Sequence, residues 1–219
     1  MPDSAHVLRV LHEDERLIAV DKPADQAVAP GGGVAAPDTL QAAVSEHIGA
    51  KAFLVHRLDR ETSGVMVFAK TAEAHRELSR QFEERLVTKR YLALVQGHVE
   101  GRSGEIREPL REFGSGRVGV DPNGREAMTR WKLRERLPDA DVLEVEPLTG
   151  RRHQIRVHLY SIGHPIMGDT RYGSPRPVGG APRLMLHAAD LTLADGTRLA
   201  AELPDDFASV LGDQRKADV

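Results

Sequence analysis

An aspartate lies between two arginines in the segment Arg57-Leu58-Asp59-Arg60, which joins two apolar stretches. Guanidinium groups close to a carboxyl stabilise its charged form and lower its pKa. An ionised, positioned aspartate can act as a nucleophile or a general base. Asp59 is therefore a candidate catalytic carboxylate. The alternative is a turn aspartate paired with a surface arginine.

A second candidate site is the run Thr149-Gly150-Arg151-Arg152-His153-Gln154-Ile155-Arg156-Val157-His158. On a helix predicted over residues 151–162, Arg152 and Arg156 are four positions apart and share a face. Gly150 would let the backbone approach a phosphate; the alternative is a solvated helix rim. The two histidines lie about 140° apart around such a helix, and no Glu follows the first. We therefore expect no metal site of the metalloprotease type.

A third candidate is Lys89-Arg90-Tyr91, where a tyrosine follows two bases and begins an alternating, strand-like segment. Tyrosine beside cations suits stacking on a nucleobase. The alternative is a tyrosine of the core. Aromatic residues make up only 4% of the chain, so any stacking would be local.

The composition excludes several classes of protein. The chain has 219 residues, of which 40% are hydrophobic and 29% charged, so it is not disordered throughout. It has no Cys, which excludes a disulfide framework, a thiolate metal site and a cysteine nucleophile. The sequence contains no nucleotide-binding glycine motif and no Gly-x-Ser-x-Gly. It also lacks a signal-peptide pattern and a membrane-spanning apolar run, and we expect a cytoplasmic protein.

The charge is unevenly distributed along the chain. The formal net charge is −3, but residues 1–50 carry −5, residues 187–219 carry −4 and residues 51–186 carry +6. A basic middle between acidic ends is compatible with a polyanion site on one face. Ordinary solvated surfaces can show the same excess.

Apolar patterning predicts more strands than helices. Helices are expected over residues 39–48, from Thr71 to about Leu86, over residues 151–162 and after Pro204. Strands are expected over residues 7–11, 17–20, 53–55, 65–69, 91–97, around 106, and over 127–137, 142–145, 184–193 and 199–203. This order favours an α+β fold, with a mixed, largely antiparallel sheet in one domain over residues 1–219.

Turn residues predict the connections. Asp121-Pro122-Asn123-Gly124 is a hairpin-turn signal. Residues 31–33, 111–121 and 173–182 are expected to be loops.

Several segments, in order, resemble the RluA-type pseudouridine synthases. His56-Arg57-Leu58-Asp59 with Thr62-Ser63-Gly64 resembles the catalytic signature of that family, residues 89–95 its tyrosine motif and residues 149–158 its third motif. Residues 17–23, 163–169 and 184–188 are also similar to family positions. The resemblance covers about residues 7–210, and we expect no N-terminal S4-like domain.

The resemblance implies isomerisation of uridine to pseudouridine in RNA without a metal or organic cofactor. Uracil is detached from C1′, turned and rejoined through C5, after the nucleotide is flipped out of its stack. Asp59 would be the catalytic carboxylate and Arg156 its ion-pair partner. Tyr91 would stack on the target base and take part in proton removal. Arg57 would help to hold the flipped-out nucleotide or would fill its vacated place.

The remaining residues expected to bind substrate or RNA are His56, Arg60, Thr62, Lys89, Arg90, Arg151, Arg152, His153 and Gln154. Arg152 stands where many relatives have Thr or Ser. The resemblance implies a ribosomal or transfer RNA stem-loop as partner, and we expect a monomer with no obligate protein partner. Residues 111–121 and 173–182 are expected to select the RNA.

Two alternatives to the enzyme are a catalytically silent RNA-binding protein of the same fold and a nucleoside hydrolase or glycosidase. The intact Asp59 argues against the first. The second would need a calcium-binding aspartate cluster or two carboxylates across the bond, and Glu61 lies too close to Asp59 in the chain to be the second carboxylate.

Overall fold

The computed structural model describes residues 8–31, 33–114, 116–173 and 180–216. Contacts divide the chain into two compact units. The first comprises Met1–Val87 and Thr192–Ala201, and the second comprises Thr88–Leu191 and Glu202–Val219. Neither unit is a continuous stretch of chain. The expectation of one domain over residues 1–219 stays a prediction.

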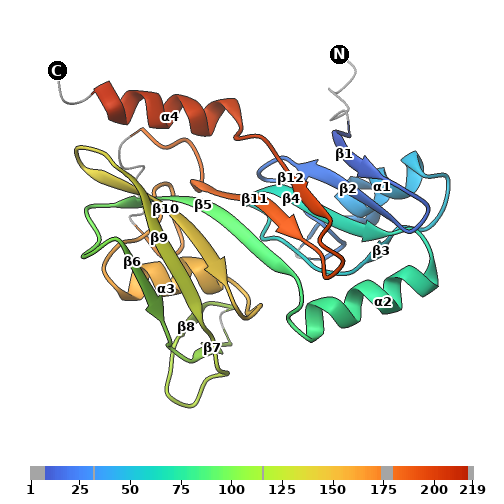
Figure 1. The fold of residues 1–219 in the computed structure, drawn as a ribbon, viewed down its shortest axis with the longest axis horizontal. Helices are drawn as coiled ribbons and strands as arrows, with labels where there is room; N and C mark the ends of the chain where they lie inside the picture. Colours follow the sequence, from blue (N-terminus) through green and yellow to red (C-terminus); the bar gives the residue numbers. More distant parts are fainter. Residues whose placement is uncertain (1–7, 32, 115, 174–179, 217–219) are drawn as a thin grey trace. The chain divides into compact units, whose positions relative to one another are not determined.

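The first unit is built on the buried strand β4 (Ser63–Ala69), in which all seven residues are buried. β4 pairs antiparallel with β2 (Leu17–Lys22) and with β3 (Phe53–Leu54), and β2 pairs antiparallel with β1 (Val10–Glu13). The unit also contains the 3-10 helix η1 (Ala36–Asp38), α1 (Leu40–His47), α2 (Ala72–Glu83) and β12 (Arg198–Ala200). In Figure 1, α2 runs beside β3 and β4, which it contacts.

Both long helices of the first unit begin at a threonine cap. The side chain of Thr39 accepts a hydrogen bond from the N–H of Ala42 at 3.2 Å, and Thr71 accepts one from Ala74 at 3.1 Å. Such caps satisfy backbone donors that have no partner within the helix. α2 ends at Glu83, three residues before the predicted end, because Arg85 has a left-handed φ of +60°.

The second unit has a sheet in the order β11-β5-β10-β9-β6. The pairs β5–β10, β10–β9 and β9–β6 are antiparallel. β7 and β8 form a separate antiparallel hairpin. The elements of this unit are β5 (Thr88–Gln96), β6 (Ser103–Ile106), β7 (Leu110–Glu112), β8 (Val118–Val120), β9 (Thr129–Arg136), β10 (Ala140–Pro147), α3 (Gln154–Ser161), β11 (Leu186–Thr192) and α4 (Asp205–Lys216).

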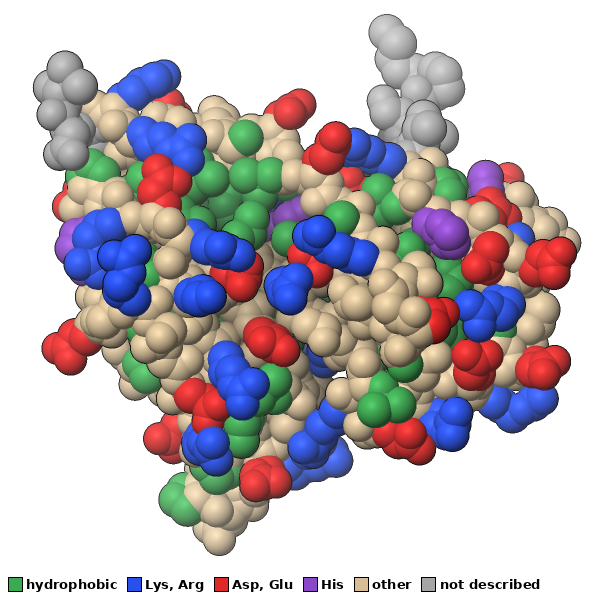
Figure 2. All heavy atoms as spheres, viewed as in Figure 1, with side chains coloured by type: hydrophobic (Ala, Val, Ile, Leu, Met, Phe, Trp, Pro, Cys, Tyr) green, Lys and Arg blue, Asp and Glu red, His purple; other side chains and the backbone are tan. Residues whose placement is uncertain are grey.

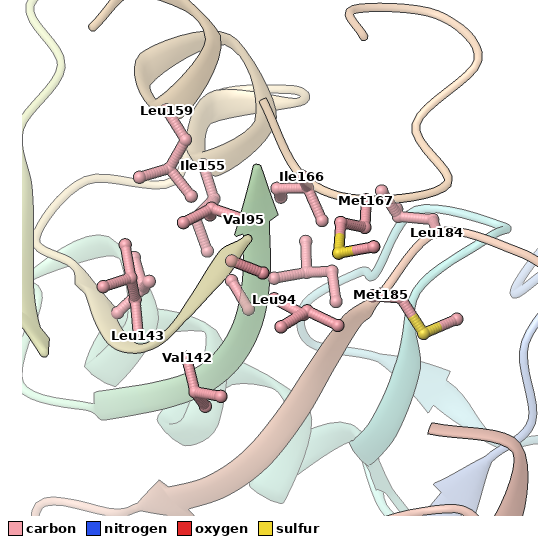
Figure 3. Packing of buried hydrophobic residues seen from close by; sticks show 14 of the residues in the cluster. Leu94, Val95, Val142, Leu143, Ile155, Leu159, Ile166, Met167, Leu184 and Met185 are labelled. Atoms are coloured by element: carbon pink, nitrogen blue, oxygen red, sulfur yellow. The ribbon is translucent and has the colours of Figure 1, made fainter. Parts of the chain in front are cut away.

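The core of the second unit joins strands, α3 and the segment after α3. Figure 3 shows Leu94 and Val95 of β5 near Ile155 of α3 and Ile166, with Met185 on the approach to β11. These side chains are 7% exposed or less. Burial of apolar surface on this scale is the main stabilising contribution to a fold. The core therefore fixes α3, which carries part of the candidate site, against β5.

The α+β fold with antiparallel strand pairs is confirmed, and two local predictions are corrected. The first strand was expected over residues 7–11, but β1 continues to Glu13, so the turn that follows it comes later. Val7 lies outside the described residues. Residues 111–121 are not one loop, because β7 and β8 form a hairpin there. The Asp121–Gly124 turn follows β8, with the Gly124 N–H donating to the Asp121 carbonyl at 2.8 Å. The expected loops at 31–33 and 173–182 include residues 32 and 174–179, which lie outside the described residues.

Candidate active site

Asp59 lies in the loop between β3 and β4, in the first unit. The Asp59 carbonyl accepts a hydrogen bond from the N–H of Thr62 at 3.1 Å, which closes a tight turn. Leu58 and Thr62 are buried, whereas Asp59 is half-buried and Arg57 is exposed. The loop is therefore anchored at Leu58 and Thr62 and presents Arg57 to solvent.

His56 anchors the start of this loop to the sheet. Its Nε2 accepts a hydrogen bond from the N–H of Val67 in β4 at 3.0 Å, and its ring stacks on Phe82 of α2 at 4.6 Å between centroids. β3 pairs with β4 only over its two residues, and the imidazole then takes the position of a strand partner. These contacts give His56 a positioning role within the loop.

Lys22 anchors the end of the loop, and the sequence reasoning did not select it as a site residue. This lysine is fully buried at the end of β2 and donates to the carbonyls of Pro23 and Arg60, each at 2.8 Å. Arg60 in turn donates from Nε to the carbonyl of Asp25 at 2.9 Å. Burial of an ammonium group costs free energy unless the group is well hydrogen-bonded. The two hydrogen bonds of Lys22 offset this cost and hold the end of the loop in place. The signal in the sequence is a lysine at the end of an apolar run.

The tyrosine motif lies in β5, in the second unit. Tyr91 pairs in register with Val145 of β10 and packs in part against the hydrophobic core. Arg90 forms an ion pair with the mostly buried Asp190, with 3.6 Å between Nη1 and Oδ1. Lys89 and Tyr91 are half-buried. β5 thus holds these three predicted residues in consecutive strand positions.

Arg156 is buried in α3 and forms a two-point ion pair with Asp169. Its Nε lies 2.8 Å from Oδ2 and its Nη2 lies 2.9 Å from Oδ1. Burial alone would raise the pKa of Asp169, but Arg156 and the amides of Tyr172 and Arg171 hold that pKa below its ordinary value. The pair uses two of the five N–H groups of the guanidinium. The expected pairing of Arg156 with Asp59 stays a prediction.

Arg152 and Arg156 do not share a helix face, so that prediction is wrong. α3 begins at Gln154, after His153 adopts a left-handed φ of +53°. Arg152 therefore lies before the helix, exposed and paired with Glu112 of β7, while Arg156 is 2% exposed. His153 is mostly buried and its Nδ1 is hydrogen-bonded to the Tyr172 hydroxyl at 2.7 Å.

Gln154 holds the segment before α3 in place. Its Oε1 accepts from the Thr149 hydroxyl at 2.6 Å and from the Arg151 N–H at 3.0 Å. Its Nε2 donates to the Met128 carbonyl at 2.9 Å and to the Thr129 hydroxyl at 3.0 Å. Four bonds are the full capacity of a glutamine amide. The structure therefore gives Gln154 a positioning role, although the sequence suggested RNA contact.

The same network continues through His158. Its Nε2 lies 2.9 Å from the Glu108 carbonyl, an acceptor, and its Nδ1 lies 2.8 Å from the Thr129 hydroxyl. Burial lowers the pKa of His158. A neutral imidazole that donates from Nε2 and accepts at Nδ1 satisfies both bonds. The hydrogen bond between Thr129 and His158 thus links β9 to α3, which carries the end of the third motif.

The predicted residues therefore fall into two groups. His56, Arg57, Asp59, Arg60 and Thr62 share one loop of the first unit, and the remaining eight belong to β5 or to residues 151–156 of the second. Sequence reasoning missed Lys22, Asp169 and Tyr172. Asp169 stands in a segment similar to the family, and a buried acid there is the partner that a buried arginine requires.

Comparisons with known proteins agree with these motifs. A family model described as RNA pseudouridylate synthase matches residues 16–161. The chain is 39% identical to the dual-specificity RNA pseudouridine synthase RluA of Salmonella typhi, over 91% of this chain and 94% of that protein. The chain belongs to the RNA pseudouridylate synthase family. It is also 42% identical to the ribosomal large subunit pseudouridine synthase D of Nitrosomonas europaea, over 93% of this chain.

Solved structures show the same fold for this pseudouridylate synthase family member. Human RNA pseudouridylate synthase domain containing 4 matches with a TM-score of 0.81 at 26% identity, over 94% of this chain and 93% of that chain. Domain containing 1, also human, matches with a TM-score of 0.76 at 30% identity, over 94% and 86%.

The curated relatives differ in length. The chain spans only 64% of the Nitrosomonas synthase D and 66% of the synthase C of Vibrio vulnificus.

Among the helices of the described residues, none combines the length and the apolar character needed to cross a bilayer.

Proposed function

We propose that this protein is an RNA pseudouridine synthase that isomerises specific uridines in structured RNA. The family match over residues 16–161 carries this proposal, together with the presence of Asp59 in the anchored β3–β4 loop. In the reaction the C1′–N1 bond of uridine breaks and a C1′–C5 bond forms. C5 loses its proton and N1 gains one, so the product is an isomer of uridine and the charge of the RNA is unchanged.

We propose the roles of the individual residues from the family resemblance, and their placement is compatible with these roles. Asp59 is the catalytic carboxylate, in a loop held by Lys22 and His56 on either side. Tyr91 stacks on the target base and assists removal of the C5 proton. Arg57 is exposed, and it holds the flipped-out nucleotide or fills its vacated place. Arg156 is the ion-pair partner of Asp59 as well as of Asp169.

We place the substrate among ribosomal and transfer RNA stem-loops. Two relatives carry names that specify the large ribosomal subunit or dual specificity, and both classes of RNA present uridines in loops from which a base can be flipped. The proposal includes action as a cytoplasmic monomer, without a metal or organic cofactor or an obligate protein partner.

The test is to incubate the purified protein with total RNA from a strain that lacks its gene and to map new pseudouridines at nucleotide resolution. The wild-type protein should modify one or a few uridines. The Asp59→Asn variant should form no pseudouridine while its RNA affinity stays within severalfold, because the carboxylate acts in chemistry more than in binding.

The matched control is Asp25→Asn, which changes a carboxylate in a nearby loop of the same unit and leaves Asp59 intact. Asp25 contributes its backbone carbonyl to Arg60, so its side chain should not matter for the reaction. An active Asp59→Asn variant would refute the role of this aspartate. RNA binding without any modification by the wild type would favour the catalytically silent RNA-binding protein.

A further inference from the structure

The outer helix α4 is tied to the rest of the second unit by two arginines, one at each of its ends. Arg183 pairs with Asp206 in the first turn of α4, and Arg215 in the last turn pairs with Glu135 of β9. Between these ends, the buried apolar residues of α4 belong to the core. In Figure 2, basic and acidic side chains cover the outer surface where Figure 1 places α4. α4 therefore covers the core from outside, and none of its residues belongs to a catalytic motif.

The guanidinium of Arg183 makes three contacts. Its Nε lies 2.5 Å from Oδ2 of Asp206, and its Nη2 lies 2.7 Å from Oδ1. Its Nη1 donates to the carbonyl of Leu184 at 2.9 Å. The Arg183 side chain is only 8% exposed, and it holds the pKa of Asp206 below its ordinary value. Because a two-point pair has a fixed geometry, Arg183 fixes the backbone at residues 183–184 together with the start of α4.

The backbone that follows Arg183 enters a junction of three chain segments. The Leu94 N–H of β5 donates to the Met185 carbonyl at 3.1 Å. The Met185 N–H donates to the Met167 carbonyl at 2.9 Å, and the Met167 N–H donates to the Leu94 carbonyl at 2.8 Å. We call these three residues the backbone junction, and Figure 3 shows them together in the core. The three hydrogen bonds form a closed ring, so a shift of one segment disturbs its bonds to both of the others.

Gly168 connects this junction to the buried pair of Arg156 and Asp169. A Cβ added to Gly168 would lie 1.7 Å from the carbonyl oxygen of Arg183 and 2.5 Å from its carbonyl carbon. Asp169 follows directly, and its carboxylate holds Arg156 through hydrogen bonds of 2.8 and 2.9 Å. A shift of the Arg183 backbone must therefore move Gly168, and with it the carboxylate that orients Arg156.

The same junction bears on Tyr91. This residue lies in β5, three positions before Leu94, so the junction sets how the strand lies against the segment that carries Asp169. Arg156 and Tyr91 are the residues of the second unit to which we assign roles in the reaction. A displacement of about 1 Å at a reacting group can lower a rate about 100-fold. The placement of the Arg183 backbone should therefore show in the rate of the reaction.

We propose that Arg183 is a positioning residue for the reaction. Through its pair with Asp206 it holds the backbone junction, and through the junction it keeps Arg156 and Tyr91 in their reactive arrangement. This inference rests on the proposed function and deepens it, because it makes the rate depend on the anchoring of an outer helix. The alternative is a role in stability alone, in which Arg183 would act only as Arg215 does at the other end of α4.

The test compares Arg183→Ala with the matched control Arg215→Ala in the full chain. Both changes remove a two-point arginine pair of α4, but only Arg183 lies at the junction. Pseudouridine formation is measured on an RNA fragment that spans the uridine modified by the wild type, below the unfolding temperature of each variant. Arg183→Ala should lower kcat about ten-fold or more while KM stays within about two-fold. Arg215→Ala should leave both constants close to wild type.

A second readout follows Arg156 without any RNA. In protein labelled with nitrogen-15, the Nε–H signal of Arg156 is assigned by its loss in Arg156→Lys. Arg183→Ala should shift this signal, because the carboxylate that accepts from Nε moves with Gly168. Arg215→Ala should leave the signal in place. A role in stability alone would not move the Arg156 signal in a folded variant.

Asp206→Asn keeps the test open if Arg183→Ala fails to fold. It removes the charge that Arg183 pairs with, while the amide oxygen can still accept from the Phe207 N–H, as the carboxylate does at 2.7 Å. Asp206→Asn should lower kcat about three-fold or more, in the same direction as Arg183→Ala. The double variant should be no slower than Arg183→Ala alone, because both changes remove one contact. Additive losses would show that the two residues act separately and would contradict the proposal.

The outcomes separate this inference from the proposed function. If the wild type forms pseudouridine and Arg183→Ala and Asp206→Asn keep its kcat, the inference falls and the function stands. Equal losses of kcat in Arg183→Ala and Arg215→Ala, or an unchanged Arg156 signal in Arg183→Ala, would leave Arg183 a role in stability alone. If the wild type forms no pseudouridine, the proposed function falls and the inference falls with it.

Discussion

Arg156 and Asp169 form the most deeply buried ion pair that the described residues contain in the second unit, with side chains 2% and 1% exposed. Two parallel N–H···O bonds give the pair a fixed geometry. The carboxylate also accepts from the amides of Arg171 and Tyr172, at 2.9 and 3.0 Å. Asp169 therefore orients the arginine that we assign to the active site.

Asp169→Asn should destabilise the protein by about 3–5 kcal/mol, because it removes one charge of a buried, two-point ion pair. Chemical denaturation followed by circular dichroism would measure this loss. The control is Glu135→Gln, which breaks an exposed pair with Arg215 and should cost little. A loss in Asp169→Asn no larger than in the control would contradict the structural role of the pair.

The same carboxylate predicts how stability depends on pH. Its pKa is lowered in the folded protein from an ordinary value of 3.8. Its contribution is therefore fully present above that value and is lost as the pH falls through the lower folded pKa. The difference in stability between the wild type and Asp169→Asn should be constant near neutral pH and should shrink only in strong acid. Denaturation of both proteins at a series of pH values down to strong acid would measure this difference.

At the scale of elements, the segment after α3 is shaped by a glycine. Gly168 has a φ of +74°, and an added Cβ would lie 1.7 Å from the Arg183 carbonyl. Gly163 has a similar φ of +85°, but a Cβ there would meet nothing within 4 Å. The two glycines share the same backbone strain and differ only in the space available.

Gly163→Ala should cost about 1–2 kcal/mol, the penalty of a left-handed alanine. Gly168→Ala should cost several times more, because two backbone segments must also separate. Since Asp169 directly follows, Gly168→Ala should lower the catalytic rate even where the protein stays folded. Denaturation curves and initial rates measure both effects, and equal costs for the two glycines would contradict the close approach.

Elements with a simple apolar period could be predicted from the sequence, and those governed by single side chains could not. The alternating residues of β5 and the four-residue spacing of α2 predicted both elements. α3 begins later than predicted because His153 takes a left-handed backbone, a conformation that histidine seldom adopts. The β7–β8 hairpin was missed because each of its strands has only three residues.

The candidate site was predictable to a similar degree. The ordered motifs located Asp59, Tyr91 and Arg156 in the chain. The partners that hold them could not be located, because Lys22 and Asp169 act through contacts distant in sequence. Gln154 differs from these, since its place in a basic motif suggested RNA contact while its four hydrogen bonds are internal; the expected RNA contact stays a prediction.

At the scale of the whole molecule, the chain enters each compact unit twice. Thr192–Ala201 returns to the first unit, and the segment from Glu202 returns to the second. Contacts between segments so distant in sequence are expected to form late in folding. The second unit therefore completes its core only when its C-terminal helix arrives.

Phe207 shows how much depends on that last helix. It is fully buried and belongs, with Val210 and Leu211 of α4, to the core cluster that contains Leu94 and Ile155. Arg183 fixes the start of α4 through Asp206, with Nη2 at 2.7 Å from Oδ1. α4 thus contributes to the core that positions β5 and α3.

Phe207→Ala should destabilise the second unit by about 3–5 kcal/mol, and it should impair the reaction although Phe207 lies outside every catalytic motif. Ser209→Ala, an exposed change in the same helix, is the control and should leave stability close to wild type. Hydrogen exchange would show increased exchange in β5 and α3 in the Phe207 variant. If exchange increased only within α4, the helix would be an appendage, and the core of the second unit would be complete without it.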